Sequence, residues 1–409
     1  MKHNRIGLDV GSTTLKVVVL DDHDNICFST YVRHNARIRE TLSVVFSELG
    51  ERFGDELFSL TITGSVGLGI AERTQIPFVQ EVVASTAYVR RYHPQATTLI
   101  DIGGEDDIAE GLPVLRAKGA KAWLSIMYGC NNFCTYCIVP YVRGREKSRK
   151  PGDILAEFRS LVEAGYKEIT LLGQNVNSYG KGLEEQIDFS DLLNLLCTVP
   201  GDYHIRFMTS HPKDASHKLI DTIAAQPKLC KHLHLPVQCG SDELLKRMNR
   251  HYTAAEYESI VNNIRGVFDN PSVTTDMMVG FAGETPEDFE ESLNFARKIG
   301  FAKVHVFAYS RRPGTAADRM PGQVPNKVKE ERSRQLIEAT NEARRRFLLT
   351  QVGRTEPVLF ESKRLEDYYE GYTANYTPVH VQSPIPLFGK ILPVKILEAG
   401  EDFCFGSLI

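Results

Sequence analysis

Three cysteines lie close together in the chain, at Cys130, Cys134 and Cys137, with the spacing Cys-x3-Cys-x2-Cys. Thiolates are the soft ligands that iron–sulfur clusters take. Three of them on one loop can bind three irons of a 4Fe–4S cube and leave the fourth iron open for a substrate or cofactor. A zinc site needs a fourth protein ligand, which His211 or His234 could supply. The spacing therefore predicts a metal centre, with the open cluster favoured and zinc as the alternative.

The elements around these cysteines alternate between strands and helices, which predicts βαβ units and a parallel sheet. The expected strands all fall in the middle of the chain: Ala122–Met127, Ile169–Leu172, Ile205–Thr209, Leu233–Val237, Val273–Val279 and Val304–Tyr309. Six units are fewer than the eight of a full barrel, so we expect an α/β fold with a partial, open (β/α)6 barrel. Sites in such sheets gather at the carboxyl ends of the strands. The candidates there are Gln174, Ser210, Gln238, Gly280 and Gly283.

The composition narrows the class of protein. The 409 residues carry a net charge of −4, which excludes a globally basic nucleic-acid binder but not a local basic face. Eight cysteines are too few for a disulfide scaffold of this length. No apolar run approaches the roughly 18 residues of a membrane span, and the first residues lack the apolar core of a signal peptide. We expect a cytoplasmic protein with no membrane partner.

Around the cysteines, the sequence resembles the radical S-adenosylmethionine enzymes and, within them, the tRNA methylthiotransferases. The resemblance covers about residues 111–409 and rests on six segments: Ser125-Ile-Met-Tyr-Gly-Cys130, Cys137-Ile-Val-Pro-Tyr-Val-Arg-Gly-Arg-Glu146, Leu171-Leu-Gly-Gln-Asn-Val-Asn-Ser-Tyr-Gly180, Arg206-Phe-Met-Thr-Ser-His-Pro212, His232-Leu-His-Leu-Pro-Val-Gln-Cys-Gly-Ser-Asp242 and Thr275-Asp-Met-Met-Val-Gly-Phe-Ala-Gly-Glu-Thr285. The first half looks most like the branch that acts on isopentenyl-adenosine. His305–Thr315 and Gly371–Tyr376 look closer to the threonylcarbamoyl-adenosine branch, which remains an alternative.

The resemblance implies one 4Fe–4S cluster on Cys130, Cys134 and Cys137, with S-adenosylmethionine on its open iron. Electron transfer would then cleave the sulfonium to a 5′-deoxyadenosyl radical, and a methylthio group would be added to C2 of a modified adenosine beside the anticodon. We expect tRNA as substrate, flavodoxin or ferredoxin as reductant, and a monomer. The strand-end residues named above become candidates for contacts to S-adenosylmethionine.

The same family carries an N-terminal domain that holds a second cluster on three further cysteines, and this cluster is implicated in sulfur delivery. In this chain only Cys27 precedes residue 111. We therefore expect sulfur insertion to be impaired.

The N-terminal residues resemble instead the first half of the actin-like activator ATPases of 2-hydroxyacyl-CoA dehydratases. The resemblance is carried by Gly7–Lys16, Thr63–Gly69, Pro77–Val82 and Asp101–Glu105. Backbone N–H groups in such Gly/Ser turns cradle phosphate, and an Asp can hold Mg²⁺. The residues of this possible vestigial nucleotide loop are Asp9, Gly11, Ser12, Thr13, Asp101, Gly103 and Gly104. Since the second half of that fold is missing, we expect weak ATP binding at best.

Four cations follow the cysteines and suit tRNA phosphates: Arg143, Arg145, Lys147 and Arg149. The alternative is a solvated charged segment before Pro151. The segment from residue 352 onward resembles the RNA-binding TRAM domain, a small β-barrel, although its five Lys/Arg and eight Asp/Glu make it acidic.

We thus expect three domains: a half actin-like α/β domain at 1–107, a radical S-adenosylmethionine core at 116–340 and a TRAM-like barrel at 341–409. The predicted function is tRNA methylthiolation. The rival interpretations are an ATP-driven electron-transfer activator and a non-catalytic chimera.

Overall fold

The computed structural model describes residues 3–10, 14–33, 38–54, 56–64, 70–71, 74–79, 84, 119–365 and 368–409. The chain divides into two compact units, Met1–Gly103 and Gly104–Ile409, each described here by itself. No helix in the described residues is both long and apolar enough to cross a membrane.

Within the residues that the structure describes, the first unit contains a four-stranded sheet and a helix packed on it. The strands β1 (His3–Val10), β2 (Thr14–Leu20), β3 (Ile26–Arg33) and β4 (Leu57–Thr63) lie in the order β3-β2-β1-β4. The β1–β2 and β2–β3 pairs are antiparallel, whereas β1 and β4 are parallel. Alternate apolar residues of β1 and β2 are buried in one core with Val45 and Leu49 of α1 (Ile38–Phe53), as the period of two in the sequence predicts.

The second unit is built on six parallel strands, at the positions that the sequence predicts. One sheet contains β5 (Lys121–Ser125), β8 (Glu168–Leu172) and β9 (His204–Phe207), and the other contains β10 (His232–His234), β11 (Ser272–Val279) and β12 (Lys303–Ala308). A parallel bridge between Ile205 and Leu229 joins the two sheets. The result is one arc in the order β5-β8-β9-β10-β11-β12.

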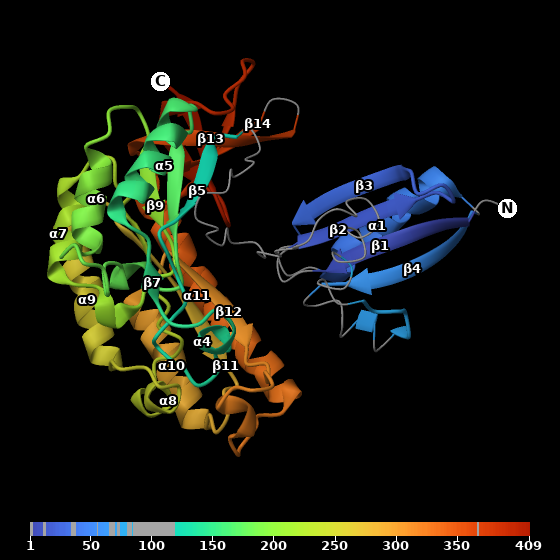
Figure 1. Ribbon diagram of the computed structural model, residues 1–409, viewed down its shortest axis with the longest axis horizontal. Coiled ribbons are helices and arrows are strands. Elements are labelled where there is room, and N and C mark those ends of the chain that lie inside the picture. Colours follow the sequence, from blue (N-terminus) through green and yellow to red (C-terminus); the bar gives the residue numbers. More distant parts are fainter. Residues whose placement is uncertain are drawn as a thin grey trace. The chain divides into compact units, whose positions relative to one another are not determined.

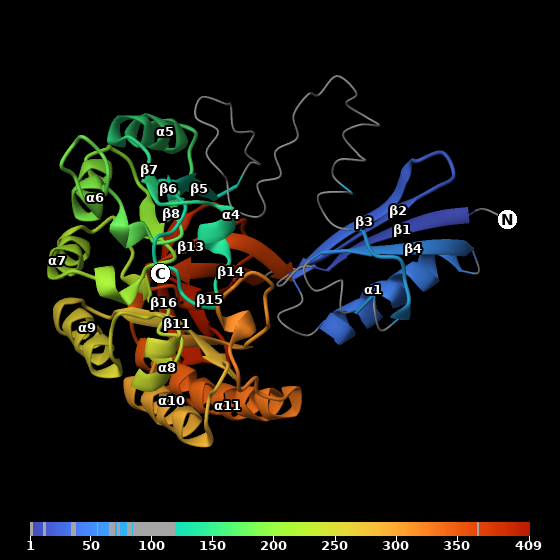
Figure 2. The same ribbon diagram turned by 60° about the horizontal axis from the view of Figure 1, so that its bottom comes forward.

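Helices alternate with these strands and follow one another around the outer side of the arc (Figure 2). They are α5 (Pro151–Glu163), α6 (Phe189–Cys197), α7 (His217–Ala225), α9 (Ala254–Val267), α10 (Pro286–Ile299) and α11 (Asn326–Gln351). Reciprocal capping boxes begin α6, α9 and α10, which explains why these helices start where they do. The connections between these elements contain shorter pieces of structure. They are the short helices α4 (Val139–Val142) and α8 (Asp242–Arg247), the 3-10 turns η1 (Val176–Ser178), η2 (Pro212–Asp214) and η3 (Ala317–Arg319), and the two-residue strands β6 (Met127–Tyr128) and β7 (Lys147–Ser148).

A small closed barrel ends the chain, in line with the all-β pattern of the sequence. Its strands β13 (Thr355–Leu365), β14 (Tyr368–Thr373), β15 (Pro378–Gln382), β16 (Ile391–Ala399) and β17 (Cys404–Leu408) close in the order β13-β14-β15-β17-β16. Figure 1 shows the barrel beside β5. The helix α11 runs unbroken past residue 340, so the boundary expected at 340/341 lies inside this helix.

A buried group of charges attaches the barrel to the amino ends of the arc strands. Arg206 and Glu168 form an ion pair of 2.8 Å, and both side chains are 2% exposed. Lys121 pairs with Glu168 at 3.1 Å and with Glu361 of the barrel. Burial alone would raise the pKa of Glu168, but Arg206 and Lys121 outweigh it and hold that pKa at about 2. The ring of Tyr376 lies 4.3 Å from the guanidinium of Arg206. At this edge the charges are compensated inside the protein.

Candidate metal centre

The cysteine loop runs from β6 to α4, and its backbone is folded tightly. Gly129 has φ +71°, and a side chain there would collide with the carbonyl of Arg145. The amide of Cys130 donates to the carbonyl of Gly144 at 3.2 Å, and the amide of Cys137 donates to that of Cys134 at 2.9 Å. The three thiols therefore lie on one ordered loop beyond the carboxyl end of β5.

The thiols are partly withdrawn from water. Cys130 and Cys134 are each 8% exposed, and Cys137 is intermediate. Burial raises the pKa of the Cys130 and Cys137 thiols above 9.0, so both are protonated near neutral pH unless a metal stabilises the thiolates. This environment suits a cationic iron core, because its positive charge would stabilise the thiolates that burial disfavours.

The spacing of possible ligands discriminates between one ion and a larger cluster. Two thiolates on one zinc, each at about 2.3 Å, lie within ~4.6 Å of each other. Among the residues described, one trio of possible ligand atoms lies within 4.8 Å of one another, formed by Glu168, His204 and Cys230. The three loop cysteines do not form such a trio, as expected if each is to bind a different iron. The trio itself faces Arg206 and Lys121, whose charges oppose a bound cation.

The histidines of the zinc alternative have other partners. A ring nitrogen of His211 accepts from the amide of Lys213 at 3.3 Å. His234 lies 3.0 Å from the hydroxyl of Thr274 and 3.5 Å from the carboxylate of Asp276. Burial, together with Arg250 and Lys213, lowers the pKa of His211 to about 2, so its ring is neutral.

The end of α8 and the residues after it hold the cysteine loop from a distant part of the chain. Thr135 bonds through its hydroxyl to the carbonyl of Arg247 at 3.0 Å and through its amide to that of Met248 at 3.1 Å. The amide group of Asn249 donates to the carbonyl of Phe133 at 3.0 Å. Arg250 donates to the sulfur of Cys134 at 3.5 Å. The sequence analysis missed these contacts, because no local pattern marks Arg250 or Asn249.

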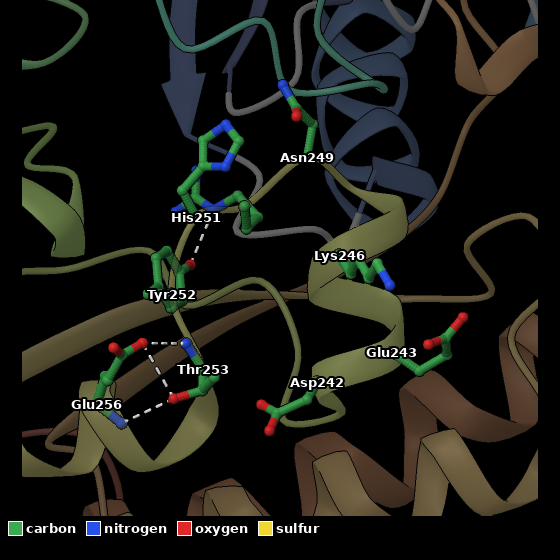
Figure 3. Close-up of a pocket in the computed structure, with 9 residues that line it drawn as sticks. Asp242, Glu243, Lys246, Asn249, His251, Tyr252, Thr253 and Glu256 are labelled. Carbon is green, nitrogen blue, oxygen red and sulfur yellow. Dashed lines mark hydrogen bonds between the residues drawn. The ribbon is translucent and has the colours of Figure 1, made fainter.

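A pocket of about 500 Å³ opens over the same segment, between α8 and the start of α9. Figure 3 shows Asn249 and His251 toward one end of it and Asp242 and Glu243 toward the other. Its lining mixes acids and bases, which gives it no strong preference for one sign of ligand charge.

Two candidates for S-adenosylmethionine contacts share an unusual feature at the strand ends. Ser210 Oγ and Gln238 Oε1 are buried, and neither donates nor accepts a hydrogen bond within the described residues. Both polar side-chain atoms of Asn177 and the hydroxyl of Tyr309 share this feature, and neither residue was a candidate from the sequence. Because buried polar atoms are normally satisfied, these groups fit a polar ligand bound along this edge.

The two glycine candidates have a packing role. Gly280 and Gly283 both have positive φ, at +70° and +80°. A Cβ on Gly280 would meet the aliphatic stem of Lys329, and one on Gly283 would meet the guanidinium of Arg247. Arg247 donates to the carbonyl of Gly283 at 2.8 Å. Protein side chains thus approach both glycines closely, and contact of either glycine with S-adenosylmethionine stays a prediction.

The four candidate tRNA cations differ in their surroundings. Arg149 is turned inward, where it donates to the carbonyl of Ser125 at 2.7 Å and pairs with Glu157 at 2.8 Å. Arg145 lies 4.5 Å above the ring of Phe133, and Lys147 lies 5.6 Å from that of Tyr128. Arg145 and Lys147 are exposed and Arg143 is half-buried, so these three form the basic surface beside the cysteines.

Of the N-terminal candidates, Asp9 lies at the end of β1, where Oδ2 accepts from Lys16 at 2.7 Å. Its Oδ1 and the hydroxyl of Thr63 on β4 are buried and find no partner among the described residues. Gly11, Ser12, Thr13, Asp101, Gly103 and Gly104 lie outside those residues.

Comparison with known proteins identifies the family. The radical SAM superfamily matches residues 124–296. A tRNA-2-methylthio-N(6)-dimethylallyladenosine synthase of Clostridium botulinum is 41% identical over 95% of this chain and 89% of its own length. The chain belongs to the radical S-adenosylmethionine tRNA methylthiotransferases.

Enzymes of the same description from Clostridium beijerinckii and Thermoanaerobacter pseudethanolicus are 45% and 50% identical, over 78% and 74% of this chain and 71% and 65% of their own lengths. A solved radical S-adenosylmethionine methyltransferase from Kitasatospora setae has a TM-score of 0.42 at 17% identity, covering 49% of this chain and 39% of its own. That score is too low to bear on the fold.

Enzymes of this superfamily use a 4Fe–4S cluster and S-adenosylmethionine, and the residues present fit both. The cysteine loop supplies three thiols, with Arg250 donating to the sulfur of Cys134 and the charge of Arg312 acting on Cys137. The strand ends supply unsatisfied polar atoms. When bound, these groups supply the reductive cleavage of S-adenosylmethionine.

Proposed function

We propose that this protein is a tRNA methylthiotransferase directed at C2 of N6-isopentenyl-adenosine, with the radical step intact and sulfur insertion impaired. The observation that carries the proposal is the ordered loop of Cys130, Cys134 and Cys137 beside a row of unsatisfied polar side chains. The names of the relatives at 41–50% identity support isopentenyl-adenosine over threonylcarbamoyl-adenosine as the substrate. A tRNA substrate also implies a cytoplasmic protein.

In this proposal the chain's own residues bind and orient. The three cysteines hold the cluster, while Ser210 and Gln238 contact S-adenosylmethionine through their unsatisfied oxygens. Gln174, at the end of the neighbouring strand β8, contacts it as well. Arg143, Arg145 and Lys147 contact tRNA phosphates near the cysteine loop, and Arg149 supports β5 from inside. The enzyme acts as a monomer and takes electrons from a flavodoxin or ferredoxin.

Initiation and sulfur insertion should separate in this chain. Cleavage of S-adenosylmethionine needs the cysteine loop and the six-strand arc, which are both present. Sulfur insertion also needs a second cluster, and Cys27 is the one cysteine before residue 111. With dithionite and S-adenosylmethionine, we expect release of 5′-deoxyadenosine, but little 2-methylthio product from tRNA that bears isopentenyl-adenosine.

Mass spectrometry of digested tRNA measures the second step. Stoichiometric methylthiolation would show that the chain needs no further cysteine set. Absence of 5′-deoxyadenosine would contradict the proposed function itself.

We infer a separate origin for the N-terminal unit, as half of an actin-like ATPase. The motifs named above and the sheet order β3-β2-β1-β4, with Asp9 at the end of β1, favour this view. Half a nucleotide cleft should not hydrolyse ATP above background. A measurable rate of ATP hydrolysis that disappears in Asp9→Ala would instead favour an ATP-driven electron-transfer activator as the function.

A further inference from the structure

Arg250 is a buried cation without a carboxylate partner. Its side chain is 7% exposed, and no described Asp or Glu forms an ion pair with it. Its Nε donates to the hydroxyl of Tyr252 at 2.8 Å, and one terminal nitrogen donates to the carbonyl of Pro236. The other terminal nitrogen donates to the sulfur of Cys134. All three acceptors are neutral unless Cys134 is a thiolate.

The acids that line the same pocket as Arg250 have other partners. Asp242, Glu243 and Glu256 line the same pocket as Arg250 (Figure 3). Asp242 accepts from the amide of Ala254 at 2.7 Å, and Glu256 accepts from the amide of Thr253 at 2.8 Å. Glu243 pairs with Arg247 at 3.3 Å. None of them compensates the charge on Arg250.

A buried charge that stays unpaired is costly, and a guanidinium does not lose its proton in proteins. The missing anion must therefore come from what Cys134 binds. A 4Fe–4S core with three thiolates carries net negative charge, and one-electron reduction makes it more negative. Hydrogen bonds to cluster sulfurs and nearby charge set the reduction potential of such centres.

We propose that Arg250 is the counter-ion of the cluster and raises its reduction potential through the hydrogen bond to Cys134. The side chain touches a ligand of the cluster and takes no part in bond making, so it is a positioning residue. The inference rests on the cluster of the proposed function and not on the tRNA substrate. It can therefore be tested even if the substrate is a different adenosine.

The test is a potentiometric titration of the reconstituted full-length protein without S-adenosylmethionine, using dithionite as the electron donor and electron paramagnetic resonance as the readout. In Arg250→Gln, the equilibrium constant for one-electron reduction should fall at least about tenfold, which is 59 mV for a one-electron couple. Arg250→Lys keeps the charge and should lie closer to the unmodified protein than Arg250→Gln does.

Lys246→Gln is the matched control. It removes a positive charge from the lining of the same pocket, at an exposed position that is not among the donors to Cys134. An unchanged potential in Arg250→Gln would overturn the proposal, as would an equal shift in Lys246→Gln.

Iron content keeps the test decisive if Arg250→Gln cannot hold the cluster. Retention of about four irons by Arg250→Lys would then support a role of the charge. Loss of iron from both variants, with circular dichroism unchanged, would reduce Arg250 to a packing role and overturn the proposal.

Discussion

Two buried arginines at opposite edges of the same six-strand arc have contrasting partners. Arg206, near the amino ends of the strands, pairs with Glu168 at 2.8 Å and stacks on Tyr376 of the barrel. Arg250, near the cysteine loop, meets a tyrosine hydroxyl, a carbonyl and a thiol. At the amino ends of the strands, the buried charge of Arg206 is paired within the protein and contributes to stability. At the carboxyl ends, the buried charge of Arg250 is left for a bound ligand to pair.

The neutral polar groups follow the same division. Near the barrel, the side chain of Asn375 bonds to the carbonyl of Asn270 and to the side chain of Gln351, each at 3.1 Å. At the carboxyl ends of the strands, Ser210 and Gln238 keep buried oxygens without a partner. Unsatisfied buried groups cost stability, so those at the carboxyl ends of the strands mark a place where a bound ligand could supply the hydrogen bonds.

The largest expected effect is on iron binding, at the edge of the arc that carries the cysteine loop. Cys134→Ala should abolish cluster binding, so that iron falls from about four per chain to background after anaerobic reconstitution. The fold should survive, because this thiol supports no strand pair. Iron analysis together with circular dichroism measures both quantities.

Cys197→Ala is the matched control for this loss, since Cys197 ends α6 and is not part of the loop. Its iron content should be unchanged. About eight irons per chain in the unmodified protein would reveal a second cluster, and the cysteine loop would then not be the single iron site.

The next largest effect is on stability, at the edge of the arc that contacts the barrel. Glu168→Gln leaves Arg206 buried without its carboxylate, while Lys121 keeps Glu361, and the change should cost about 3–5 kcal/mol of stability near pH 7. Trp123, the single tryptophan, lies in β5 and reports urea unfolding of this unit by fluorescence. Iron binding should remain intact.

The exposed Glu163, at the end of α5, provides the control, and Glu163→Gln should change stability little. If Glu168→Gln lost the cluster instead of stability, the two edges would not be separate in function.

The stability due to Glu168 should also depend on pH. Burial opposes ionisation, but Arg206 and Lys121 lower the pKa from 4.5 to about 2. A lowered carboxyl pKa means that the contribution is complete above about pH 4.5 and is lost as the pH falls toward 2. Urea unfolding between pH 3 and 7 should thus show a smaller acid-side loss in Glu168→Gln than in the unmodified protein.

The smallest effect concerns single strand-end oxygens. Ser210→Ala removes a hydroxyl that has no partner among the described residues, so stability should be unchanged or slightly higher. S-adenosylmethionine should bind about fivefold more weakly, which corresponds to ~1 kcal/mol. Calorimetry on the reconstituted protein measures this.

Ser216→Ala should behave in the opposite way. Ser216 caps α7 through the amide of Leu219, so its loss should cost about 1 kcal/mol of stability without changing affinity. Equal affinities of Ser210→Ala and the unmodified protein would remove Ser210 from the binding edge.

The sequence by itself determined the local features. Six apolar segments separated by helical patterns predict the six strands. This works because the periods of strands and helices, two and 3.6 residues, appear in the order of apolar and polar residues along a short segment. Turn residues and short strands predict the terminal barrel. The cysteine spacing predicts a loop for a cluster, since all three ligands lie within eight positions.

Only the tertiary structure decided which distant residues serve that loop. Arg250 reaches Cys134 across 116 positions, and Asn249 reaches Phe133 across the same number. Arg149 looks in sequence like its basic neighbours, yet Glu157 and the Ser125 carbonyl hold it inside. Gly280 looks like a ligand contact, yet Lys329 fills the space beside it. Such pairings depend on how the arc brings strand ends together, and one-dimensional spacing carries no information on contacts made at that range.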